Sequence, residues 1–178
     1  MNKPALTSNS IPFPDCYWVL SERFLAGPFP GADEEKETRR KLVRLLQYGI
    51  TALVDLTEED QHPPYQSYLR EEARGMGRQT SYLRMAIKDF SVPTVKEMIR
   101  ILDTIDQYLM DGEKVYLHCL GGIGRTGMVV GCFLARHGKD GKAALQKVTE
   151  LRQSVLSRSR SPETDEQISF VLNWQTGK

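Results

Sequence analysis

The chain has 178 residues, of which 40% are apolar, and it carries 24 Lys and Arg against 23 Asp and Glu. This length and apolar content suit one domain with a sizeable core, and a formal charge of +1 gives no reason to expect a nucleic-acid partner. No apolar run approaches the roughly 20 residues that cross a bilayer, and the polar start lacks a signal-peptide core, so we expect no membrane partner. Three cysteines are too few and odd in number for a disulfide framework, which favours a cytoplasmic location.

Strands and helices alternate along the chain after a predicted flexible lead-in at residues 1–14, which is rich in Pro, Ser and Asn. Short apolar or alternating runs predict strands at 17–20, 23–25, 50–56, 81–87 and 115–118, the first two as a hairpin. Apolar periodicity and charge patterning predict helices at 33–48, 65–73, 95–109, 128–137, 142–155 and 162–174. This alternation predicts a single α/β domain over residues 15–178, with a central, mostly parallel sheet flanked by helices.

Two helix starts carry local capping signals. Thr94 and Glu97 form a capping box ahead of the helix that begins at Val95. Ser161 is a good N-cap residue, and Pro162 after it suits a first helical turn. These signals predict helices that start at residues 95 and 162.

The segment from His118 to Gly127, HCLGGIGRTG, is the most informative part of the chain. A predicted strand leads into it and a predicted helix follows it, so backbone N–H groups and the positive end of a helix dipole point at one small volume. That volume favours an anion, and Arg125 adds a fork of donors that suits two phosphate oxygens. The same groups stabilise a thiolate, so we expect Cys119 to be largely ionised at neutral pH and to act as a nucleophile beneath a bound phosphate.

Other residues of this segment are expected to support the nucleophile. Three glycines allow the loop to curl tightly with its N–H groups inward: Gly121, Gly122 and Gly124. The Thr126 hydroxyl is expected to hydrogen-bond the Cys119 sulfur and to stabilise it as a leaving thiolate. His118 is expected to order the loop through hydrogen bonds rather than to transfer a proton.

A proton donor is predicted upstream of the loop, because displacing an alcohol or phenol from phosphorus needs an acid for the leaving oxygen. Asp89 follows a predicted strand and precedes the capped helix, which places it on a loop at one end of the sheet. From there it could overhang the cysteine loop, and its carboxylate could afterwards activate water. The alternative for Asp89 is a solvated or capping carboxylate, and the neighbouring Phe90 fits either a contact with a substrate ring or loop packing.

Together these residues resemble the signature of the cysteine-based protein tyrosine phosphatase superfamily. Cys119 and Arg125, with five residues between them, match its phosphate loop, and the segment from Asp89 to Pro93 resembles its mobile acid loop. The 30-residue spacing from Asp89 to Cys119 is similar to that of small dual-specificity phosphatases, and the loop interior resembles that of the kinase-associated type. Similar segments at 24–30 and 161–167 extend the resemblance over about residues 17–174.

By this resemblance, Cys119 is the nucleophile that forms a phosphocysteine and Asp89 is the acid, with no metal or cofactor required. The phosphate is bound by the arginine and by the backbone N–H groups of the loop: Leu120, Gly121, Gly122, Ile123, Gly124 and Arg125. His118 and Gln167 are supporting residues, and Gln167 is a candidate for orienting water; tyrosine-specific members place glutamine where Glu163 falls. The loop interior carries no charge, unlike that of phosphoinositide-cleaving relatives, and the elements that deepen the tyrosine-specific pocket are missing, which implies a shallow, permissive site.

The predicted function is therefore hydrolysis of phosphotyrosine, and in a broader form also of phosphoserine and phosphothreonine, in a protein or peptide partner by a monomeric enzyme. Three other functions stay open: a phosphoprotein-binding module without turnover, a phosphatase of RNA 5′ ends or inositol phosphates, and rhodanese-like sulfur transfer. The near-zero net charge and the uncharged loop disfavour RNA and inositol phosphates. Cys132 is expected in the core, whereas Cys16 is either a small structural residue or a disulfide partner for Cys119.

Overall fold

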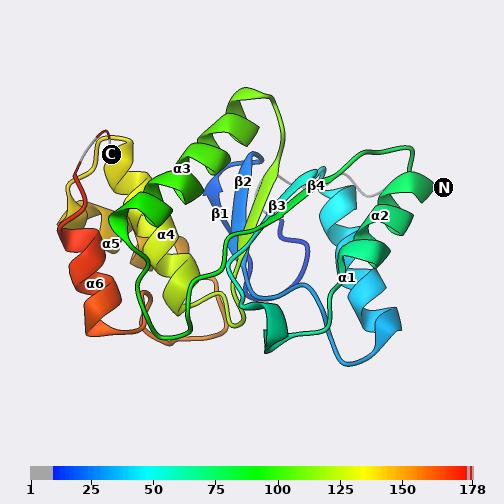
Figure 1. Ribbon diagram of the computed structural model, residues 1–178, viewed down its shortest axis with the longest axis horizontal. Helices are drawn as coiled ribbons and strands as arrows, with labels where there is room; N and C mark the ends of the chain where they lie inside the picture. The colour runs from blue at the N-terminus through cyan, green and yellow to red at the C-terminus, as the bar shows by residue number, and fades with distance from the viewer. Residues whose placement is uncertain (1–9, 176, 178) are drawn as a thin grey trace.

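A five-stranded sheet forms the centre of the computed structural model, which describes residues 10–175 and 177 (Figure 1). The strands are β1 (Tyr17–Leu20), β2 (Phe24–Gly27), β3 (Ala52–Asp55), β4 (Ser81–Arg84) and β5 (Val115–His118). They lie in the order β1-β2-β5-β3-β4; β1 pairs antiparallel with β2, and the remaining pairs are parallel. The predicted α/β fold with a mostly parallel central sheet is confirmed.

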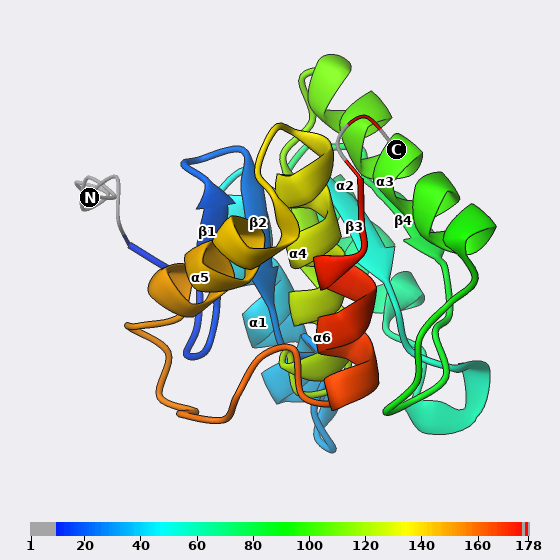
Figure 2. The ribbon, with the colours of Figure 1, turned by 90° about the vertical axis from the view of Figure 1, so that its left-hand side faces the viewer.

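Helices cover both faces of the sheet (Figure 1 and Figure 2). On one face lie α1 (Glu35–Gln47) and α2 (Gln66–Gly75), and on the other lie α3 (Val95–Met110), α4 (Gly124–Arg136), α5 (Gly141–Leu151) and α6 (Asp165–Leu172). A short 3-10 turn, η1 (Glu59–Gln61), follows β3. Within residues 10–175 we find no helix that combines the length and the apolar character needed to cross a bilayer.

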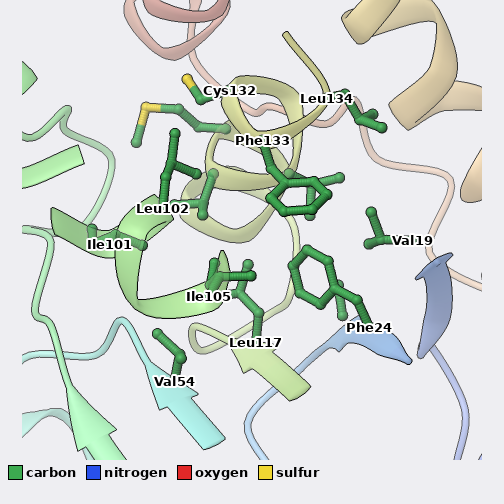
Figure 3. Close-up of a cluster of buried hydrophobic side chains, with 14 of the residues drawn as sticks. Val19, Phe24, Val54, Ile101, Leu102, Ile105, Leu117, Cys132, Phe133 and Leu134 are labelled. Carbon is green, nitrogen blue, oxygen red and sulfur yellow. The ribbon is translucent and has the colours of Figure 1, made fainter. Parts of the chain in front are cut away.

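The two-residue period of the strands divides the core into two layers. Phe24 and Leu117 point into the layer under α3 to α6, whereas their neighbours Leu25 and Tyr116 point into the layer under α1 and α2. In the first layer the Phe24 ring packs edge-on against that of Phe133, with 5.0 Å between the ring centroids (Figure 3). Burial on both faces explains why β3 and β5 are apolar runs rather than alternating ones.

The predicted start of α3 is confirmed, and that of α6 is wrong. The capping box at Thr94 is formed as expected. However, α6 begins only at Asp165, with Thr164 as its cap. The Ser161 hydroxyl donates instead to the carbonyl of Ile123 in the cysteine loop, at 2.7 Å, and this tertiary contact outweighs its local capping preference.

Part of the predicted flexible lead-in packs on the domain. The indole N–H of Trp18 donates to the Ser10 carbonyl at 3.0 Å, and Arg44 donates to the Pro12 carbonyl at 2.8 Å. Residues 10–14 are therefore held against the domain, which corrects the prediction for that stretch. Residues 1–9 lie outside the described residues, and for them flexibility stays a prediction.

Candidate active site

The cysteine loop joins the carboxyl end of β5 to the amino end of α4. Cys119 directly follows the last residue of β5 and is 3% exposed. α4 begins at Gly124 rather than at Met128, so Arg125 and Thr126 belong to its first turn. The unpaired N–H groups of that turn and the positive end of the helix dipole therefore face the loop, as the sequence predicts.

Donors from outside the loop hold its carbonyl groups outward. The Phe29 N–H donates to the Leu120 carbonyl (2.8 Å), Arg152 Nη1 to the Gly122 carbonyl (2.7 Å) and the Ser161 hydroxyl to the Ile123 carbonyl (2.7 Å). A trans peptide places the N–H of the next residue opposite its carbonyl, so the N–H groups that follow these carbonyls face the interior of the loop. Three distant segments of the chain thus impose the anion-binding shape.

Gly122 occupies a position that only glycine fits. Its φ is +68°, and a Cβ there would lie 2.4 Å from the carbonyl carbon of Gly27. Both the backbone conformation and the lack of space exclude a side chain. The end of β2 therefore packs directly against the cysteine loop.

Asp89 and Arg125 are in direct contact. Asp89 Oδ1 lies 3.0 Å from Arg125 Nη2, and the aspartate side chain is 36% exposed whereas that of the arginine is 1% exposed. Arg125 Nη1 also donates to the Ile87 carbonyl at 3.0 Å and to Gln61 Oε1 at 2.8 Å. Within the described part of the chain Arg125 Nε has no hydrogen-bond partner, which leaves this donor for an incoming oxygen. The structure thus brings together the predicted acid and the predicted phosphate-binding arginine.

A cavity of about 190 Å³ contains the cysteine and the groups around it. It is lined by the acid loop, the cysteine loop and the segment before α6: Asp89, Phe90, Cys119, Leu120, Gly121, Ile123, Gly124, Arg125 and Glu163. Phe90 is 60% exposed and Leu120 is 42% exposed, so two apolar side chains flank the cavity, and loop packing is the less favoured alternative for Phe90. A larger cavity of about 960 Å³ lies at the opposite ends of the strands and contains no cysteine.

His118 is buried behind the nucleophile and makes two hydrogen bonds. Its Nδ1 lies 3.1 Å from the Cys119 carbonyl, and its Nε2 lies 2.6 Å from the Tyr65 hydroxyl. Burial lowers the pKa of His118, so we assign a neutral ring that donates through Nδ1 and accepts from Tyr65 through Nε2. Buried Asp55 lies 3.8 Å from Nδ1. This geometry supports the prediction that His118 orders the loop.

Two predicted supporting contacts take other forms. The expected hydrogen bond from Thr126 to the Cys119 sulfur is not formed, since Thr126 Oγ1 is buried without a partner among residues 10–175. Gln167 lies near the loop, but its Oε1 accepts from backbone N–H groups at the start of α6 and its Nε2 donates to the Ser91 carbonyl at 3.2 Å. In this arrangement Gln167 fastens α6 to the acid loop, and a role in orienting water stays a prediction.

Sequence reasoning missed three residues that contact the site: Gln61, Arg152 and Asp55. Gln61 reaches it from η1, Arg152 from the end of α5, and Asp55 from the end of β3. No motif marks the first two, because polar side chains in turns and at helix ends are most often solvated. Asp55 did carry a signal, since it is an acid that ends a buried apolar strand.

This strand, loop and helix, with a buried arginine facing an aspartate, define the class of the cysteine-based protein tyrosine phosphatases. A profile of the family described as "Tc-R-P: Polymorphic toxin system, DSP-PTPase phosphatase" matches residues 31–139, which is more than half of the chain. The chain belongs to this family, and it is an atypical dual-specificity member of the superfamily.

Individual relatives agree with this assignment. The chain is 30% identical over 124 residues to the putative tyrosine phosphatase 067L of Invertebrate iridescent virus 3, across 66% of this chain and 45% of that protein. It spans about half the length of the curated relatives it matches. A crystal structure of Tk-PTP in the active form has a TM-score of 0.71 and 25% identity, over 89% of this chain and 95% of that one. TpbA of P. aeruginosa, in complex with phosphotyrosine, shares the fold at a TM-score of 0.64 and 16% identity, over 98% and 93% of the two chains.

Proposed function

We propose that the protein hydrolyses phosphotyrosine in proteins or peptides through a phosphocysteine formed on Cys119. The observation that carries this proposal is the convergence of Cys119, Arg125 and Asp89 on one small cavity. The three residues supply a nucleophile, a phosphate-binding cation and an acid, which are the groups that hydrolysis of a phosphomonoester needs. Membership of a DSP-PTPase family supports the same reaction.

The reaction follows in two steps from these positions. In the first, the Cys119 thiolate attacks phosphorus, the bond from phosphorus to the tyrosine oxygen breaks, and Asp89 gives its proton to that oxygen. Arg125 and the loop N–H groups bind the oxygens of the transferring phosphoryl group. In the second, Asp89 as a carboxylate takes a proton from a water molecule that attacks the phosphorus. The S–P bond then breaks and leaves phosphate and the Cys119 thiolate.

The surroundings of the cavity favour an aromatic phosphate ester. Exposed Phe90 and Leu120 flank the cavity, where a phenyl ring gains more apolar contact than the short side chain of phosphoserine. The loop interior offers no charged side chain for further phosphates. The complex of TpbA with phosphotyrosine supports the same substrate on this fold.

The broader setting of the reaction is part of the proposal. We extend the substrates to phosphoserine and phosphothreonine at lower rates, and we propose a monomer that acts in the cytoplasm. The three cysteines Cys16, Cys119 and Cys132 are unpaired, which suits a reducing compartment. Burial raises the pKa of Cys16 to about 12 and also raises that of Cys132, so the structural alternative for Cys16 is favoured over a redox role.

A panel of matched peptides that carry phosphotyrosine, phosphoserine or phosphothreonine tests this function. In the presence of a metal chelator, the wild-type protein is expected to cleave the phosphotyrosine peptide with a kcat/KM about 10-fold or more above the other two. Binding of phosphopeptides without turnover would favour the binding-module alternative. Faster cleavage of RNA 5′ phosphates or inositol phosphates would overturn the substrate assignment.

A further inference from the structure

The side chain of Gln61 joins the acid to the phosphate-binding arginine. Its Oε1 accepts from Arg125 Nη1 at 2.8 Å, and its Nε2 donates to Asp89 Oδ2 at 3.3 Å. Arg125 and Asp89 also pair directly, with 3.0 Å between Nη2 and Oδ1. One carboxamide thus closes a ring of three polar contacts beside the cavity.

The turn that carries Gln61 also holds the backbone of the acid loop. The N–H of Glu58, which precedes η1, donates to Gln61 Oε1 at 3.2 Å. Glu58 Oε2 accepts the N–H of Asp89 at 3.1 Å. Figure 2 shows η1 beside the loop that leads into α3. The acid loop is therefore fixed at two points, its backbone by Glu58 and its carboxylate by Gln61.

The chemistry of an amide suits this position. A glutamine accepts a hydrogen bond from a guanidinium through its oxygen and donates to a carboxylate through its nitrogen at the same time. A glutamate at position 61 could only accept, and it would place a second negative charge beside Asp89. A lysine could only donate, and it would face the positive Arg125.

We propose that Gln61 is a positioning residue of the reaction, an inference that rests on the proposed function. When the substrate phosphate binds Arg125 Nη2, it displaces Asp89 Oδ1 from that nitrogen. The hydrogen bond from Gln61 to Oδ2 then keeps the carboxyl group over the site, with its proton on the free Oδ1 that faces the leaving oxygen. Gln61 also holds Arg125 in place through Nη1. A displacement of about 1 Å at such a site costs on the order of 100-fold in rate.

Two substitutions at position 61 separate the two contacts. Gln61→Met removes both hydrogen bonds at similar side-chain volume, whereas Gln61→Glu keeps an acceptor for Arg125 and loses the donor to Asp89. Glu59→Gln is the matched control, because Glu59 is an exposed residue of the same turn. Each variant, with Asp89→Asn as the reference, is assayed on p-nitrophenyl phosphate, whose phenol leaves readily, and on phenyl phosphate, whose phenol needs a proton. Inhibition by inorganic phosphate reports on Arg125.

The expected result depends on the leaving group. Gln61→Met should lower kcat about 30-fold on phenyl phosphate but no more than about 3-fold on p-nitrophenyl phosphate, since only the first needs the acid. Gln61→Glu should show the same dependence while keeping wild-type inhibition by phosphate, which Gln61→Met weakens. Combining Gln61→Met with Asp89→Asn should add little further loss, because the glutamine acts through the aspartate.

Equal losses on both substrates, or losses that add fully in the double variant, would overturn this role and leave Gln61 a structural residue. A similar loss in Glu59→Gln would overturn it as well. If the wild-type protein cleaves neither substrate, or if Asp89→Asn shows no dependence on the leaving group, the proposed function itself fails. If Asp89→Asn shows that dependence and Gln61→Met behaves as wild type, only the inference about Gln61 fails.

Discussion

At the scale of single residues, Arg152 determines how one peptide of the cysteine loop is oriented. Its buried guanidinium donates to the Gly122 carbonyl at 2.7 Å and lies 5.5 Å from the centre of the Tyr17 ring. We predict that Arg152→Met lowers the free energy of unfolding by about 2 kcal/mol, the usual value for a hydrogen bond to a charged group. It should also weaken inhibition by inorganic phosphate by about 10-fold, because the N–H of Ile123 is no longer held inward. Exposed Arg158→Met is the control, and unchanged phosphate inhibition in Arg152→Met would contradict this role.

Local sequence context decides which site residues can be predicted. Cys119 and Arg125 lie in one continuous segment, where a strand end, glycines and a helix start together define their chemistry. Asp89 is marked by its place between a strand and a capped helix. Gln61 and Arg152 act through contacts with segments far away in the chain, so nothing in their own neighbourhood indicates a role.

At the scale of elements, a glycine of α4 allows α6 to approach closely. A Cβ at Gly131 would lie 2.8 Å from Val171 Cγ1, so Gly131→Ala must push the two helices apart. We predict a loss of about 1–3 kcal/mol in the free energy of unfolding, measured by denaturant titration. Gly75→Ala at the end of α2 meets nothing within 4 Å and should be neutral or stabilising by up to about 1 kcal/mol. Equal stability of the two variants would contradict this packing.

Helix boundaries were predicted well only where the signal is local. The capping box at Thr94 is such a signal, and α3 starts where it predicts. Apolar periodicity locates a helix from its core-facing residues, so it missed the first turn of α4, whose residues serve the loop. The start of α6 depends on Ser161, which binds the Ile123 carbonyl and leaves the cap to Thr164. Only the folded chain brings Ser161 and Ile123 together.

At the scale of the whole molecule, buried ionisable groups at the carboxyl ends of β3 and β5 make stability depend on pH. Burial raises the pKa of Asp55, but His118 and hydrogen bonds from Thr57 and Tyr82 outweigh it and leave that pKa below its usual value. Burial lowers the pKa of His118. Both shifts mean that the unfolded chain binds more protons than the folded one, so stability falls as the pH falls. The loss begins below about pH 6.5 for His118 and below about pH 4 for Asp55.

We therefore predict that Asp55→Asn lowers the free energy of unfolding by about 2 kcal/mol at neutral pH. The stabilisation by the carboxylate is present above the unfolded pKa of about 3.9 and is lost as the pH falls through the lower folded value, so the two proteins should converge in acid. Urea unfolding at a series of pH values measures this, with exposed Asp60→Asn as the control. A difference that stays constant down to acidic pH would contradict the assignment.

Covalent phosphate on Cys119 is the central claim, and rapid quenching in denaturant tests it most directly. Wild-type protein is mixed with a peptide that carries radiolabelled phosphotyrosine, and the quenched protein is digested to locate the label. The predicted result is a labelled peptide that contains Cys119, formed within the first turnover and absent from Cys119→Ser, which should bind the peptide without releasing phosphate. Turnover by Cys119→Ser at the wild-type rate, or phosphate release by the wild type with no label on Cys119 at any time, would contradict it.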